Sequence, residues 1–208
     1  MITEYISQID SLDSILNEEI LRVKDKEDLE KGFDTTIDYT PYEFDAMNFK
    51  GISALKNVKS IVGSLGEGVI SKYIILKVSI ENDENKLEKF FLRGFEAIKT
   101  RHVQIATSFL SQEIYPIAGA QFNLPMEWPM NKIDGNPEKS LIRESNKVNL
   151  EILVIGGAMY QFDNKKLIIF DRSEAFGSVP ELYLANQADL FQQLLQKPAY
   201  QGYKFSYK

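Results

Sequence analysis

One histidine offers the clearest chemistry in this chain. His102 is the only imidazole among 208 residues, and no cysteine is present to act as a nucleophile. Cationic residues accompany it in sequence, with Arg101 directly before it, Lys99 close behind and Arg93 nine residues back. Histidine titrates near neutral pH, and fixed positive neighbours suit an anionic group such as phosphate. The stretch therefore predicts an anion site, and a histidine that serves packing alone is the alternative.

Two predicted strands precede this histidine. A near-continuous apolar run from Ile70 to Ile80 is typical of a buried strand, and a second strand is predicted over 87–95 after a polar turn. Antiparallel pairing would bring Lys72, at the start of the first strand, close to Arg93, at the end of the second. We therefore expect two cations to point toward one edge of the sheet.

A helix is predicted over 96–114, because apolar residues recur there at helical spacing. His102 would lie in its first turns, where the backbone amides and the helix dipole favour a bound anion and a neutral imidazole. Thr100 is a candidate N-terminal cap, which would make His102 the second helical residue.

Composition excludes several classes of function. The net charge of −6 argues against broad binding of nucleic acid, so any anion site must be local. Without cysteine there is neither a disulfide framework nor a thiolate metal site, and no cluster of metal ligands is evident, so no metal or other cofactor is expected. No apolar run reaches the length of a membrane span, and the acidic N-terminus differs from a signal or transit peptide. A cytoplasmic protein without membrane insertion is expected.

The chain is expected to divide into an N-terminal extension, residues 1–56, and a compact domain, residues 57–208. Within the extension, residues 1–31 predict an amphipathic helix, and an aromatic-rich extended strap follows it. Residues 115–149 contain four of the seven prolines and the only tryptophan, and are expected to form a long insertion outside the sheet. Trp128 in this insertion is expected to serve packing.

The second half predicts a strand ending at Gly156 and Gly157, a strand over 166–171, an amphipathic helix over 181–196 and a short final strand over 203–207. This order of elements predicts an α+β (α/β) fold, a mixed β-sheet with helices packed on it. The glycine pair does not match the dinucleotide fingerprint, and neither a P-loop nor a G-x-S-x-G elbow is present. Asp163 and Asp171 are expected to cap turns.

Five motifs appear in an order that resembles the Janus/Ocnus family, the phosphohistidine phosphatases. They are GVISKYIILKV, FFLRGF, RHVQIA, LVIGG and NKKLIIFDRSEAFG. The resemblance covers about residues 57–207, and the only histidine falls on the family's catalytic motif. It implies a phosphohistidine-phosphatase-like fold, which is a mixed sheet with helices packed on it, and an activity that uses no metal.

The resemblance also implies roles for individual residues. His102 corresponds to the family's catalytic histidine, a nucleophile or general base. The other matched positions would hold phosphate: Lys72 and Arg93 by charge, Val103 by its amide, and Ser173 and Ala175 in a turn of hydroxyl and amide groups.

Three departures from the family pattern affect the predicted site. Ala158 stands where the family has an arginine near the phosphate, and Arg101, before the histidine, is an auxiliary candidate to replace that charge. Glu174 places a carboxylate in the predicted phosphate turn, where it would repel an anion if it pointed inward.

Two functions of different class follow. In the first, the protein hydrolyses phosphoramidate P–N bonds of phosphohistidine-containing proteins without a metal. In the second, it is a non-catalytic subunit of a multi-protein assembly, which docks through the N-terminal helix and the 115–149 insertion. A phospho-ligand binder without turnover is a third reading.

Overall fold

The computed structural model describes residues 55–63, 68–82, 86–130, 137–145 and 148–207. The predicted amphipathic helix and the strap up to residue 54 lie outside these residues. Leu55 and most of the predicted compact domain lie within them.

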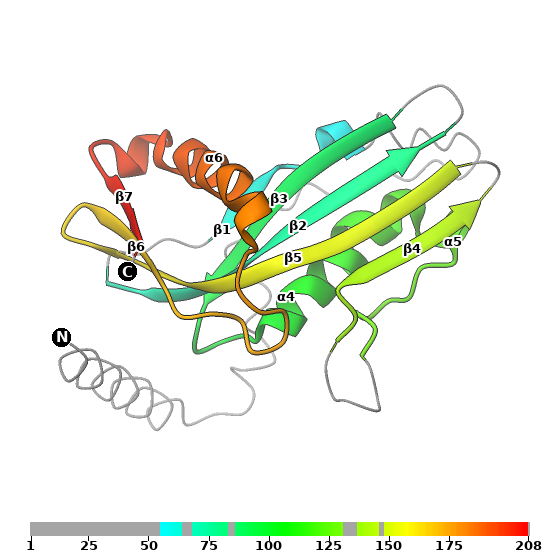
Figure 1. Cartoon of the computed structure of the whole chain (residues 1–208), viewed down its shortest axis with the longest axis horizontal. Helices are drawn as coiled ribbons and strands as arrows, with labels where there is room; N and C mark the ends of the chain where they lie inside the picture. The colour runs from blue at the N-terminus through cyan, green and yellow to red at the C-terminus, as the bar shows by residue number, and fades with distance from the viewer. Residues whose placement is uncertain (1–54, 64–67, 83–85, 131–136, 146–147, 208) are drawn as a thin grey trace.

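A single mixed sheet dominates the described part of the chain (Figure 1). Its path runs β1-β3-β2-β5-β6-β7, with β4 also paired to β5. The strands are β1 (Ile61–Gly63), β2 (Ile70–Glu81), β3 (Lys86–Glu96), β4 (Ser140–Ser145), β5 (Val148–Asp163), β6 (Lys166–Phe170) and β7 (Lys204–Tyr207). The β1–β3 and β6–β7 pairs are parallel and the others are antiparallel. The predicted mixed sheet is confirmed, while β1 was not predicted.

The predicted hairpin of β2 and β3 is also confirmed. Lys72 pairs with Phe95, and Arg93 pairs with Ile74, two residues along β2. The two cations therefore start from the same corner and the same face of the sheet, because residues two apart on a strand face one side.

Strand β5 is the longest strand of the sheet, and its two edges are used differently. One edge pairs with β2 from Asn149 to Gln161, with one extra residue at Ile155 that forms a β-bulge. On the other edge β4 pairs with residues 148–153 and β6 with residues 159–163. A gap of five residues, 154–158, is left between β4 and β6. The predicted strand end at Gly156 and Gly157 is therefore wrong, because both glycines lie inside β5, in this gap.

Helices cover both faces of the sheet (Figure 1). On one face, α4 (His102–Ser108), a π-helical stretch η1 (Phe109–Gly119) and α5 (Ala120–Phe122) follow one another directly. On the other face lies α6 (Leu184–Leu195), between the short turns η2 (Glu181–Tyr183) and η3 (Pro198–Tyr200). Alternate residues of β2 enter the two cores, Ile74 on the α4 face and Tyr73 on the α6 face. The helix over 181–196 was predicted correctly.

The 115–149 stretch was expected to lie outside the sheet, and this is wrong in part. The helical path continues through Pro116 to Phe122, and β4 adds a strand to the sheet. The four prolines favoured a loop, so neither element was predicted. In the structure Leu141 of β4 is fully buried. Trp128 packs edge-on against Phe176 with 3% of its surface exposed, so its predicted packing role is confirmed.

Candidate functional site

The start of α4 is fixed by side-chain and backbone hydrogen bonds. Gln104 reaches back, and its Oε1 accepts a hydrogen bond of 2.7 Å from the Arg101 amide. Arg101 is the N-terminal cap, and its carbonyl accepts the first helical bond from Ile105 at 3.1 Å. His102 is therefore the first residue of the helix. The expected cap, Thr100, lies one residue too early, and the predicted start at residue 96 is six residues early.

The imidazole of His102 is held by a backbone carbonyl. Only 7% of the residue is exposed, and its Nε2 lies 3.2 Å from the Ala158 oxygen in β5. Because a carbonyl oxygen can only accept, Nε2 carries the proton and the neutral ring has its lone pair on Nδ1. Nδ1 has no hydrogen-bond partner among the described residues.

The surroundings favour this neutral form of the ring. Burial lowers the pKa of His102, and the positive charge of Lys72 lowers it further. The Ala158 hydrogen bond and the carboxylates of Asp171 and Glu174 act in the opposite direction without reversing the shift. At neutral pH the imidazole is therefore available as a base or nucleophile.

Lys72 lies beside this ring. Its Nζ donates a hydrogen bond of 3.2 Å to the Thr100 carbonyl, two residues before His102. Burial lowers the pKa of Lys72, with Glu174 opposing and Arg101 adding to the shift. The structure thus brings the predicted cations Lys72 and Arg101 to the start of the helix that carries the histidine. Arg101 is exposed.

The turn after β6 closes over the gap in β5. The Ser173 amide donates to the Gly157 oxygen at 2.8 Å, and the Gly157 amide donates to the Gly177 oxygen at 3.0 Å. A Cβ at Gly156 would lie 2.6 Å from the Ser178 oxygen, and one at Gly157 would lie 3.2 Å from Cδ2 of His102. Both glycines are therefore needed for close approach, Gly156 to the turn and Gly157 to the Tyr73 oxygen, 2.3 Å from an added Cβ, with the imidazole next to it.

Ser173 and Ala175 lie inside this turn. Ser173 is 1% exposed, and its Oγ accepts a hydrogen bond of 3.1 Å from the Phe176 amide. Ala175 is half-buried against the α4-side core, as is Val103 in α4. The Ser173 hydroxyl thus stabilises the turn, and the Val103 amide belongs to the second residue of the helix.

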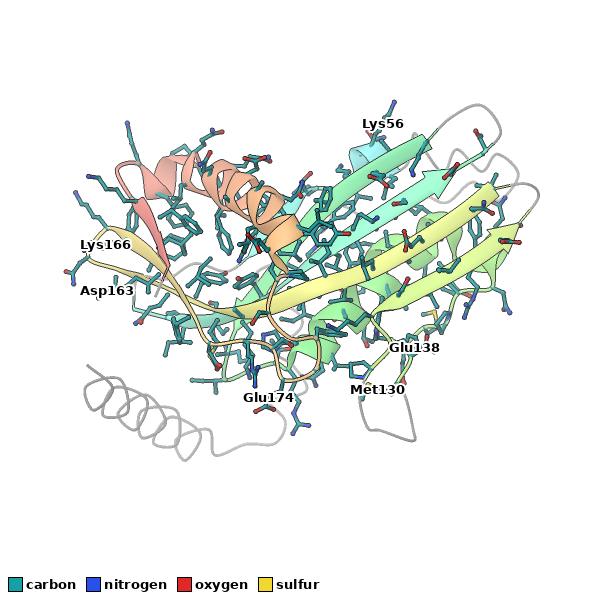
Figure 2. The ribbon with its side chains drawn as sticks, in the orientation of Figure 1. Lys56, Met130, Glu138, Asp163, Lys166 and Glu174 are labelled. Atoms are coloured by element: carbon teal, nitrogen blue, oxygen red, sulfur yellow. The ribbon has the colours of Figure 1, made fainter. Side chains whose placement is uncertain are left out.

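Two carboxylates border the same place. Lys72 of β2 pairs with Met159 of β5, which pairs in turn with Phe170 of β6. Asp171 directly follows Phe170. Its φ of 62° and the 2.7 Å bond from the Arg172 amide to its Oδ1 confirm the predicted turn cap. Glu174 is exposed, next to Ser173, and Figure 2 shows it beside the start of α4. Sequence reasoning missed that both carboxylates act on Lys72 and His102.

Arg93 was expected in the phosphate site, and its side chain is committed elsewhere. Its guanidinium makes five hydrogen bonds: two to the Glu113 carboxylate and three to the carbonyls of Lys59, Ser60 and Leu92. The rings of Phe91 and Phe109 lie 5.2 and 5.0 Å from its Cζ. All its donors are used, so Arg93 holds η1 and the segment before β1 against the sheet. Arginine in the apolar run FFLRGF was the signal for a buried counter-ion, which sequence reasoning missed.

No protein-family model matches the sequence, and none of the curated proteins is similar to it. Within the described ranges, no group of three or more histidine or carboxylate side chains is arranged to hold a metal ion. Nor does any helix of those ranges have the length and apolar character needed to cross a membrane. The observations define a mixed-sheet α/β protein with a histidine–lysine pair at a helix start.

Proposed function

We propose that this protein hydrolyses phosphoramidate P–N bonds on proteins, with phosphohistidine as the substrate expected from the family resemblance. The observation that carries the proposal is how His102 is held: its Nε2 lies 3.2 Å from the Ala158 oxygen. Its Nε2–H is donated to the Ala158 carbonyl, which leaves the Nδ1 lone pair for phosphorus or for a water molecule. Nδ1 has no hydrogen-bond partner among the described residues, as a nitrogen that reacts with phosphorus or water requires.

The neighbouring groups suit the chemistry of phosphoryl transfer, which depends on positioning and charge stabilisation. Lys72 would stabilise the phosphoryl oxygens, and exposed Arg101 would add charge from the helix cap. In the reaction a bond forms from phosphorus to Nδ1 or to the water oxygen, and the P–N bond breaks with its electron pair on nitrogen. Water then releases inorganic phosphate in the first case. In the second, Nδ1 accepts the water proton.

The test is a phosphohistidine peptide assay with the wild type and His102→Ala in parallel. The variant should lose about 10²- to 10⁴-fold in kcat/KM, the range expected for a general base, while urea unfolding reports whether the fold persists. An acid-labile phosphate trapped on His102 would identify it as the nucleophile. A folded wild type that leaves the peptide intact, or a folded variant with an unchanged rate, would contradict the proposal.

A non-catalytic subunit is the second candidate, and exposed apolar side chains favour it. Of the five large hydrophobic residues exposed in the described ranges, three fall in the 115–149 stretch: Met126 (54%), Met130 (46%) and Ile142 (58%). This is the stretch that sequence analysis assigned to docking.

The second candidate is tested by peroxide oxidation of methionine. Met126 and Met130 should oxidise readily in the purified protein and be protected in gently lysed source cells, where an assembly would persist. Equal oxidation in both samples would remove this candidate.

A further inference from the structure

Glu174 and Asp171 stand where an anion-binding site would not be expected to place carboxylates. Both are exposed, they flank the buried Ser173, and both lie close enough to influence Lys72 and His102. The backbone places both residues: the Ser173 amide is bonded to Gly157, where an added Cβ would lie 3.2 Å from the imidazole, and Asp171 directly follows Phe170, the last residue of the rung that begins at Lys72. The site therefore presents cations and carboxylates around the imidazole of His102, whose Nδ1 has no partner among the described residues.

A phosphoramidate that is ready to react has the same mixed charge. Its phosphoryl oxygens are negative, while the nitrogen group must carry a proton to leave as a neutral amine or imidazole. A phosphate monoester with a phenol or alcohol leaving group has negative oxygens and no positive centre. Carboxylates beside the cations would thus attract the first class of substrate at its leaving group and repel the second.

We infer that Glu174, assisted by Asp171, binds the positive charge on the leaving nitrogen and so selects N-phosphorylated basic side chains over phosphate esters. This inference rests on the proposed function and assigns the two carboxylates a role in specificity. In the step itself the P–N bond of the protonated substrate breaks, and its electron pair neutralises the leaving group. The substrate's proton stays in place, on the leaving nitrogen of phospholysine or on the other ring nitrogen of phosphohistidine. Phosphorus is taken by Nδ1 of His102 or by water. The carboxylates stabilise the charge and transfer no proton.

Binding of the leaving group and simple repulsion of phosphate predict opposite effects of Glu174→Gln on P–N substrates. If Glu174 only repelled phosphate, Glu174→Gln would raise kcat/KM for every phosphorylated substrate. If it binds the leaving group, the same change lowers kcat/KM for P–N substrates and raises it for P–O substrates. One charge removed at a partly solvated site corresponds to about tenfold in each direction.

The experiment measures kcat/KM of wild type, Glu174→Gln and Asp171→Asn on phosphohistidine peptide, phospholysine peptide and phenyl phosphate. Glu144→Gln is the control, because it removes an exposed carboxylate on β4 that takes no part in the site. We expect the ratio of P–N to P–O turnover to fall about a hundredfold in Glu174→Gln, less in Asp171→Asn, and to stay constant in the control.

Two failures are distinguishable. If the wild type cleaves the P–N substrates but Glu174→Gln shifts both classes in the same direction or neither, the specificity role is wrong and the proposed function stands. If the wild type cleaves none of the three substrates, the proposed function fails and the inference fails with it.

Discussion

Lys72 and Arg93 start from one corner of the sheet and have different roles. Both point to the α4 face, and their strand positions differ by only two residues of register. Arg93 is 2% exposed and has all five donors bonded, with Glu113 neutralising its charge. Lys72 is half-buried, and its described hydrogen bond goes to a neutral carbonyl. The comparison teaches that a cation can serve a ligand only where the fold has not committed all of its hydrogen-bond donors.

The largest expected effect, a loss of stability, comes from removing the counter-ion of Arg93. Glu113→Ala would leave a buried guanidinium without its counter-ion, which costs about 3–5 kcal/mol of unfolding free energy. Urea unfolding measures the loss. The pair of exposed Lys99 and half-buried Glu96, 2.9 Å apart, is the control, and Glu96→Gln should cost less than about 1 kcal/mol.

A double variant separates charge from shape. Arg93→Met with Glu113→Leu removes both charges and should recover much of the stability lost in Glu113→Ala. If Glu113→Ala proves as mild as Glu96→Gln, Arg93 is not held as described, and it returns as a candidate for the phosphate site.

Substitution of Lys72 should lower activity and leave the unfolding free energy nearly unchanged. Lys72→Met removes the cation beside His102, and kcat/KM for phosphohistidine peptide should fall about a hundredfold, as for the loss of one electrostatic stabiliser. Unfolding free energy should change little, since burial already lowers the pKa of this amine and disfavours its charged form. Lys99→Met, at an exposed lysine nearby, should leave activity unchanged. Equal rates for all three proteins would show that Lys72 takes no part in the reaction.

Gly157 links the site to the sheet, and an alanine there should disturb both. The new Cβ would lie 2.3 Å from the Tyr73 oxygen and 3.2 Å from the imidazole. Because the first neighbour is backbone, the strands must shift, at a cost of about 1–3 kcal/mol. Gly63→Ala, which meets only the end of the Tyr160 side chain at 3.2 Å, is the milder comparison.

The readout for Gly157→Ala is unfolding free energy together with the NMR shifts of the His102 ring. Both should change in Gly157→Ala, and the ring shifts should stay constant in Gly63→Ala. An unchanged ring in Gly157→Ala would mean that the close approach of Gly157 does not position the histidine.

Sequence patterns predicted most of this fold because its strands are strongly apolar and its turns are polar. The β2–β3 hairpin and α6 followed from periodicity alone. Strand β4 could not be predicted, because its exposed Ile142 and neighbouring polar residues resemble a loop, and only its pairing with β5 makes it a strand. His102 and Lys72 were expected together, and Lys72 does lie at the start of the helix that carries His102, while their role in a phosphate site stays a prediction. Arg93 was misplaced because no local pattern reveals Glu113, twenty residues away on another element.

The smallest expected effect is a pH dependence that belongs to one residue. His102 is the only histidine in the chain, so between about pH 5 and 7 it is the side chain expected to titrate. Burial and Lys72 lower its pKa in the folded state, so the unfolded chain binds the proton more tightly. Its contribution to stability is therefore complete above the unfolded pKa of about 6.5 and is lost as pH falls toward the folded pKa. The slope cannot exceed about 1.4 kcal/mol per pH unit.

Urea unfolding of wild type and His102→Asn across this window measures the effect. The wild type should lose stability on acidification and the variant should have a flatter profile. Lys72→Met gives a further test. Removing the nearby positive charge raises the folded-state pKa of His102, so stability should be lost over a narrower range of pH. Parallel profiles for wild type and His102→Asn would mean that the ring is not held neutral by its surroundings. The same profile in activity, falling as His102 gains its proton, would connect the folding and catalytic roles of one nitrogen.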